Sequence, residues 1–165
     1  MNYKKIISGL FASALLMTTT HLYAEAPAKK DDKPVYGEYR DWPILGVSHR
    51  TEKNSMRAIV GNDVAIKAAR SGNIKPWPDG TIIGKITWKE RPHPQWPSAI
   101  VPGEFTGAEA MVKDSKKFAE TGGWGFAHWE GDKLIMNDKE KSATCFACHT
   151  AAKDTDHMFT IPVLR

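Results

Sequence analysis

Alternating hydrophobic and polar residues mark one segment of the chain as a β-strand. In residues 81–89, TIIGKITWK, Ile82 and Ile86 fall on one face of the segment. Ile83 and Lys85 fall on the other face. A period of two is the spacing of side chains on a strand. The pattern therefore predicts a strand whose second face carries lysine, and it leaves open whether that face meets solvent or a binding site.

The rest of the chain alternates short strand patterns with brief helical ones. Further strands are expected at residues 35–50, 57–60, 104–113 and 124–130. Helices are expected at residues 63–72, 114–123 and 139–149, a proline-rich loop at 91–102, and an extended tail at 159–165. N-caps are available at Asn62 or Asp63 and at Asn137 or Asp138. This order predicts an α+β fold, a mainly antiparallel β-sheet with a few short helices, one of them near the C-terminus.

The first residues have the pattern of a secretory signal peptide. Lys4 and Lys5 precede an apolar run at residues 6–17 that is too short to span a bilayer, and small residues follow. Cleavage is expected after Ala24 or Ala26. No later segment is apolar enough to cross a membrane. The sequence therefore predicts export, and the short basic leader favours a bacterial periplasm.

After the signal peptide at residues 1–24, the sequence predicts a short flexible segment followed by one domain. Residues 25–34 are expected to be flexible, and residues 35–165 to form a single domain. Loss of the two leader lysines lowers the formal charge from +4 to about +2. A charge this small, without a basic stripe, excludes a nucleic-acid partner.

The only two cysteines lie in TCFACHT, close to the C-terminus. On a helix, Cys145, Cys148 and His149 stand at positions i, i+3 and i+4, so that the three side chains share one face. Cys-x-x-Cys-His is the signature of covalent haem c attachment, in which the histidine is the proximal iron ligand. The motif therefore predicts one covalent haem c per chain, with His149 on the metal.

Three other uses of the cysteines fit less well. A redox dithiol normally opens a helix in a βαβ setting, which this sequence lacks. A disulfide across two residues closes almost no loop. A zinc site would need a second Cys/His pair at zinc spacing, and the sequence offers none.

The late position of the motif bears on the sixth iron ligand. Met158 is the sole methionine after His149, and a core or lid role suits it better than ligation. Without a strong sixth ligand the iron stays open to small molecules. The four-helix cytochromes c′ share an open iron, but residues 35–130 are rich in glycine, proline and tryptophan and show no long helical stripes.

Four stretches together resemble the cytochrome P-460 family, which also contains the sheet-rich cytochromes c′-beta. They are residues 61–90, 110–129, 145–149 and 159–165, and the resemblance runs from about Tyr39 to Arg165. It implies a mainly antiparallel sheet, a homodimer, and one haem c with an open distal face. It also implies activity on hydroxylamine, alone or with nitric oxide, in the founding members, whose haem is linked to a lysine. The c′-beta members lack that link and bind nitric oxide.

The resemblance assigns roles to two further residues. Lys85 matches the lysine linked to the haem, although here Ile-Thr follows it where the founding pattern has an acidic residue. Arg57 matches a distal arginine that could donate hydrogen bonds to a bound nitrogen compound. Lys89 is a weaker alternative to Lys85, and Glu104 or Glu109 could serve as a distal base.

Two functions of different classes follow from these expectations. The first is a periplasmic haem enzyme that oxidises hydroxylamine and passes electrons to an external acceptor, with Lys85 and Arg57 at its catalytic site. The alternative is a non-catalytic c′-beta-like cytochrome that binds nitric oxide or carries electrons. A haem protein serving an unidentified redox partner is a third possibility, and the sequence alone leaves open whether the chain is an enzyme.

Overall fold

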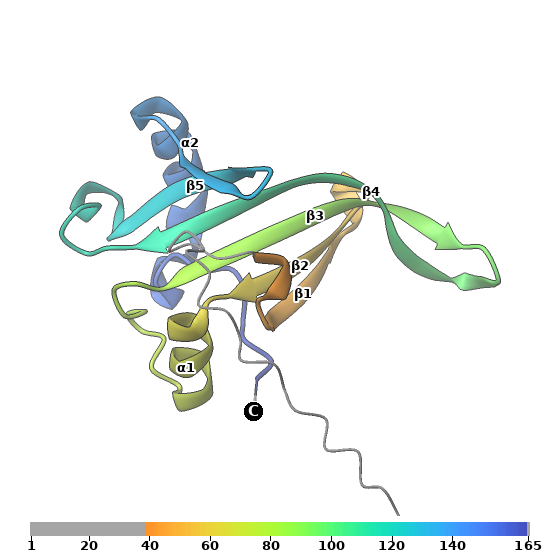
Figure 1. The fold of residues 1–165 in the computed structure, drawn as a ribbon, viewed down its shortest axis with the longest axis horizontal. Coiled ribbons are helices and arrows are strands. Elements are labelled where there is room, and N and C mark those ends of the chain that lie inside the picture. The colour runs from red at the N-terminus through yellow and green to blue at the C-terminus, as the bar shows by residue number, and fades with distance from the viewer. Residues whose placement is uncertain (1–38, 165) are drawn as a thin grey trace, which may run out of the picture. The chain divides into compact units, whose positions relative to one another are not determined.

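A six-stranded antiparallel sheet dominates the computed structural model, which describes residues 39–164 (Figure 1). The strands pair in chain order and are β1 (Ile44–Arg50), β2 (Ser55–Gly61), β3 (Ile82–His93), β4 (Trp96–Lys113), β5 (Trp124–Glu130) and β6 (Lys133–Met136). The helices are α1 (Asp63–Ser71) and α2 (Lys139–His149). Short 3-10 helices lie at Tyr39–Asp41, Thr51–Lys53, Ala119–Thr121 and Thr150–Thr155. The predicted α+β class with a mainly antiparallel sheet is confirmed.

Part of the sequence interpretation lies outside the described residues. The expected signal peptide at residues 1–24, the leader at 25–34 and the start of the first expected strand all precede residue 39. Within the described residues, no helix is long and apolar enough to span a membrane.

Helix α1 begins and ends where its local signals place it. The side chain of Asn62 accepts a hydrogen bond from the backbone N–H of Ala65 at 3.0 Å, which makes Asn62 the N-cap. Gly72 ends the helix in the left-handed conformation, with φ 73°. The same Asn62 oxygen accepts from the N–H of Ile82 at 3.1 Å. Asn62 therefore also ties the start of the helix to the start of β3.

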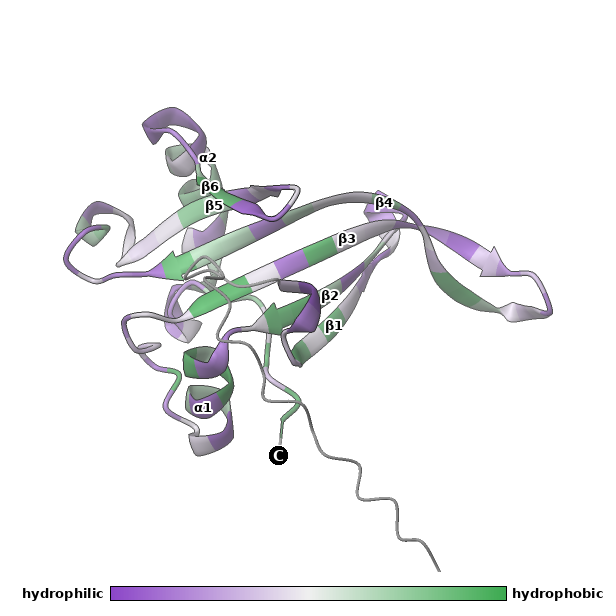
Figure 2. Ribbon diagram, in the orientation of Figure 1, coloured by the Kyte–Doolittle hydropathy of each residue, from purple (hydrophilic) through white to green (hydrophobic). Residues whose placement is uncertain are grey.

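Strand β3 separates two hydrophobic clusters, as its period of two predicts. Ile82 and Ile86 pack with Tyr39 and Trp129 in one cluster. Ile83 packs in the other, which also receives residues of α1 and α2. Figure 2 shows hydrophobic and hydrophilic residues following one another along β3. Because successive strand residues point to opposite faces, Lys85 lies on the Ile83 face, the face that α2 approaches.

The proline-rich segment at residues 91–102, expected to be a loop, is instead a strand pair. β3 continues to His93 and β4 begins at Trp96, with Pro92 opposite Ile100. Pairing of β2 with β3 ends at Lys89, so this outer pair has free edges on which a proline without an N–H is tolerated. The pair, called the β3–β4 arm below, extends away from the rest of the sheet in Figure 1.

One other predicted element is wrong, one begins later than expected, and one was missed. Residues 114–123 form turns and the 3-10 helix Ala119–Thr121, because the Asp114 carboxylate accepts from the N–H groups of Lys116 and Lys117 and closes a turn. Residues 39–41 of the first expected strand are a 3-10 helix, and β1 starts only after Pro43. Strand β6, which pairs with β5, was not predicted.

Candidate haem site

Helix α2 contains the Cys-x-x-Cys-His stretch in its last turns. Asp138 caps the helix by accepting a hydrogen bond from the N–H of Lys141 at 2.8 Å. The two thiols are not joined in a disulfide: Cys145 is half-buried against the core and Cys148 is exposed. Burial raises the pKa of the Cys145 thiol, and the charge of Glu109 acts in the same direction. Both cysteines are thus available on a helix face that also carries His149.

The imidazole of His149 is oriented by a backbone carbonyl. Its Nδ1 lies 2.7 Å from the C=O of His157, and since a carbonyl only accepts, Nδ1 carries the proton. The rings of Phe126 and Phe159 flank it, with centroids 5.4 and 5.1 Å away. Burial lowers the pKa of His149, and the nearby charge of Lys85 lowers it further. A neutral imidazole with a fixed Nδ1–H presents Nε2 as a metal ligand.

A cavity of about 790 Å³ adjoins His149 and Cys148. Its walls come from β1, β2, β3 and β4, from the end of α2, and from residues 158–161. Three of its hydrophobic residues are largely exposed: Val47 at 73%, Phe159 at 57% and Ile161 at 80%. Exposed apolar side chains gathered around one hollow are typical of a ligand site with an apolar occupant.

Charged residues occupy the strand side of the same cavity. Lys85 of β3 and Glu109 of β4 are opposite each other in the sheet and form an ion pair. Arg57 of β2 also lines the cavity, and its Nε is buried without a hydrogen-bond partner among the described residues. Burial lowers the pKa of Arg57, which Glu109 partly counteracts. A buried donor without a partner beside an apolar hollow indicates a missing acceptor.

The structure brings most of the sequence-predicted site residues together. Lys85, Arg57, Cys148 and His149 all line the cavity, and Cys145 lies one helical turn before Cys148. Met158, for which the sequence favours a core or lid role, is buried at 5% exposure and also contributes to the wall.

Other candidates lie elsewhere or are already bonded. Lys89 pairs with Glu104, at 2.6 Å, and neither lines the cavity. The ring of His128 is hydrogen-bonded to Asn137 at 2.8 Å and to Glu130 at 3.2 Å, and it does not line the cavity.

Sequence reasoning missed the contributions of His157, Phe159 and Ile161. His157 orients His149, and the other two residues line the cavity. The only available signal was their position shortly after the Cys-x-x-Cys-His motif.

The residues present fit a haem. The cavity is large enough for a large cofactor, and part of its lining is exposed and apolar. The thiol of Cys148 and the oriented imidazole of His149 line it, and Cys145 lies one helical turn before Cys148. A bare metal ion fits less well, because residues 39–164 contain no group of three or more His, Cys, Asp or Glu side chains placed to hold one.

The comparison with protein families agrees with this geometry. The family model Cytochrome P460 matches residues 37–160, which is most of the chain. A comparison with curated proteins gives no match. The matched span contains the sheet, both helices and every residue of the cavity wall except Ile161. The chain belongs to the cytochrome P460 family, and this membership implies a haem cofactor.

Proposed function

We propose that the chain is a periplasmic mono-haem c protein that oxidises hydroxylamine. Thioether bonds from Cys145 and Cys148 would attach the haem, and Nε2 of His149 would bind its iron. The observation that carries the proposal is the oriented imidazole of His149, which faces a cavity also lined by Lys85 and Arg57. Bound in this way, haem supplies one-electron redox chemistry and a coordination position for a small nitrogen compound.

The charged residues of the cavity give the protein's part in that chemistry. The unpartnered Nε of Arg57 is placed to donate a hydrogen bond to hydroxylamine or to a more oxidised nitrogen species. Glu109 is the cavity carboxylate and is placed to accept protons released as hydroxylamine is oxidised. The electrons leave to a periplasmic acceptor.

Lys85 is the residue proposed to carry a second covalent link to the haem. Lys85 lines the cavity, on the face of β3 that α2 approaches. A bond from Lys85 to the edge of the haem would therefore not require β3 to turn its other face to the cavity. That bond would replace one hydrogen of the Lys85 amine and one hydrogen of the haem edge, and the two electrons would pass to an external oxidant of the peroxide class, which is reduced to water. The ion pair of Lys85 with Glu109 would then be broken, leaving the carboxylate free as a base. In this proposal, formation of the Lys85 link is what frees Glu109 to accept protons.

A c′-beta-like function is the second candidate, and the Lys85–Glu109 ion pair favours it. A lysine held by a carboxylate is protonated and is a poor nucleophile. In this alternative the haem has no lysine link, and the cavity captures nitric oxide or serves electron transfer without turnover of hydroxylamine.

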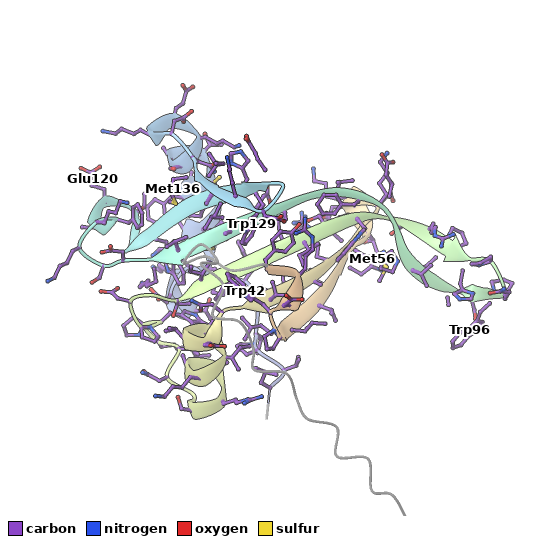
Figure 3. All side chains as sticks on the ribbon, in the orientation of Figure 1. Trp42, Met56, Trp96, Glu120, Trp129 and Met136 are labelled. Atoms are coloured by element: carbon purple, nitrogen blue, oxygen red, sulfur yellow. The ribbon has the colours of Figure 1, made fainter. Side chains whose placement is uncertain are left out.

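A homodimer is proposed as the assembly. The β3–β4 arm exposes large apolar side chains, Trp96 at 65% and Ile100 at 40% exposure. Figure 3 places Trp96 at the outer end of this arm. A second copy would cover this surface, which is costly to leave in water.

Replacement of Lys85 by leucine separates the two candidates. In Lys85→Leu we expect the haem to be retained, the spectrum to become that of ordinary high-spin haem c, and hydroxylamine oxidation with an artificial electron acceptor to be lost. Lys89→Leu is the matched control, because Lys89 lies on the same strand and pairs outside the cavity. An active parent whose Lys85→Leu variant keeps its spectrum and rate would contradict the cross-link.

A further inference from the structure

A buried ion pair lies close to the cavity but outside its wall. Lys113, the last residue of β4, is 5% exposed, and its Nζ donates to both carboxylate oxygens of Asp156 at 2.9 Å. The same Nζ donates to the C=O of Gly122 at 3.0 Å and lies 4.8 Å from the ring centroid of Trp124. Burial of a lysine is costly unless the charge is paired and hydrogen-bonded, and here it is both.

The carboxylate of Asp156 joins a further segment to this pair. It accepts a hydrogen bond from the backbone N–H of Trp77 at 2.8 Å. The backbone C=O of Asp156 accepts from the indole Nε1 of Trp124, also at 2.8 Å. Asp156 is thus fixed through its side chain by Lys113 and Trp77, and through its main chain by β5.

Asp156 directly precedes His157, the residue whose carbonyl orients His149. Asp156 and His157 both adopt the left-handed conformation, with φ 52° and 63°. This turn directs the C=O of His157 to Nδ1 of His149 at 2.7 Å, while Nδ1 of His157 lies 3.3 Å from the C=O of His149. Non-glycine residues keep such backbone angles where surrounding contacts determine them.

We propose that Lys113 and Asp156 are positioning residues for the axial histidine. By holding the turn at Asp156, the ion pair fixes the His157 carbonyl against His149 and so sets the strength of that hydrogen bond. A histidine ligand that donates its second N–H is more basic and is held in one orientation. The inference rests on the proposed role of His149 as the iron ligand, and it adds the group that controls how strongly His149 binds.

Asp156→Asn in the haem-loaded protein is the direct test. Asparagine tolerates the left-handed conformation and can still accept from Trp77, but it no longer holds Lys113 by charge. A weaker His149–His157 hydrogen bond makes the imidazole a poorer donor to iron. In the ferrous protein we expect the iron–histidine stretching band in resonance Raman spectra to shift to lower frequency. We also expect the oxidised state to be disfavoured by on the order of tenfold, which raises the midpoint potential by about 59 mV.

Two further variants separate positioning from a general loss of stability. Lys113→Met combined with Asp156→Asn removes both charges, so that no unpaired buried charge disturbs folding, and it should show the same two shifts. Ile82→Ala destabilises the protein by removing a side chain from the hydrophobic cluster on the other face of the sheet. This variant should leave the iron–histidine band and the midpoint potential unchanged.

The outcomes distinguish this inference from the proposed function. A parent with an iron–histidine band that stays unchanged in both Asp156 variants would overturn the positioning role alone. A parent without that band would overturn His149 as the ligand, and the positioning role with it.

Discussion

At the scale of single residues, Gly122 lies against His157, the residue whose carbonyl orients His149. Gly122 has φ 66°, and a Cβ built on it would lie 2.6 Å from Nε2 of His157. Its carbonyl also accepts the hydrogen bond from Lys113. The ring of His157 also contacts Phe146, at a centroid distance of 5.0 Å. The position therefore needs glycine both for its backbone and for the space that it leaves.

Gly122→Ala should destabilise the protein more than the same replacement at a glycine that also has a positive φ but has no neighbouring atoms to clash with the added methyl group. Gly131 has a similar φ of 61° with nothing within 4 Å of a Cβ, so Gly131→Ala is the matched control. We expect Gly122→Ala to lose about 1 to 3 kcal/mol more free energy of unfolding, because the methyl group overpacks against His157. Urea denaturation of the haem-loaded variants measures the difference. Equal losses in the two variants would show that the His157 contact contributes nothing.

Residue types and spacing predict which residues carry the chemistry of the site, but not which residues hold them in position. The sequence identifies Cys145, Cys148 and His149 because the motif is local, and the structure brings Lys85 and Arg57 to the cavity beside Cys148 and His149. The roles of His157 and Lys113 depend instead on a turn and an ion pair between segments distant in sequence. No local pattern marks such residues, so sequence reasoning passed over them.

At the scale of elements, the predictions succeed where the signal is local. Helix α1 has a cap at each end, and β3 has a clear period of two. The arm and residues 114–123 were predicted wrongly because their outcome depends on partners. The prolines of residues 91–102 favour a loop when the opposite strand is not known, and Asp114 closes a turn where a helix was expected to begin. Strand β6 is short and exists by pairing with β5.

At the scale of the whole molecule, the sheet forms one wall of the cavity and extends into the β3–β4 arm, to which we assign the proposed dimer contact. The cavity lies where β1 to β4 meet the end of α2, whereas the arm carries paired strands beyond that region. Its residues Trp96 and Ile100 are exposed hydrophobics. This separation predicts that assembly and haem chemistry can be altered independently.

The arm supplies the test of the proposed homodimer. We expect the parent protein to sediment as a dimer at micromolar concentration, and a Trp96→Ser, Ile100→Ser double variant to sediment as a monomer with an unchanged haem spectrum. Ile135→Ser, which replaces an exposed hydrophobic residue on β6, should remain dimeric. A monomeric parent would contradict the proposed assembly, and a dimeric double variant would place the interface elsewhere.

The central claim is that Cys145, Cys148 and His149 hold a haem in the cavity beside Lys85. Its most direct test is the visible absorption spectrum of the purified protein, oxidised and then reduced with dithionite, recorded before and after denaturation. We expect haem absorption that stays with the polypeptide after denaturation, with a broad, red-shifted reduced Soret band if Lys85 is linked and an ordinary high-spin spectrum if it is not. Protein without haem absorption, from a host with working cytochrome c maturation, would show that these three residues do not hold a haem.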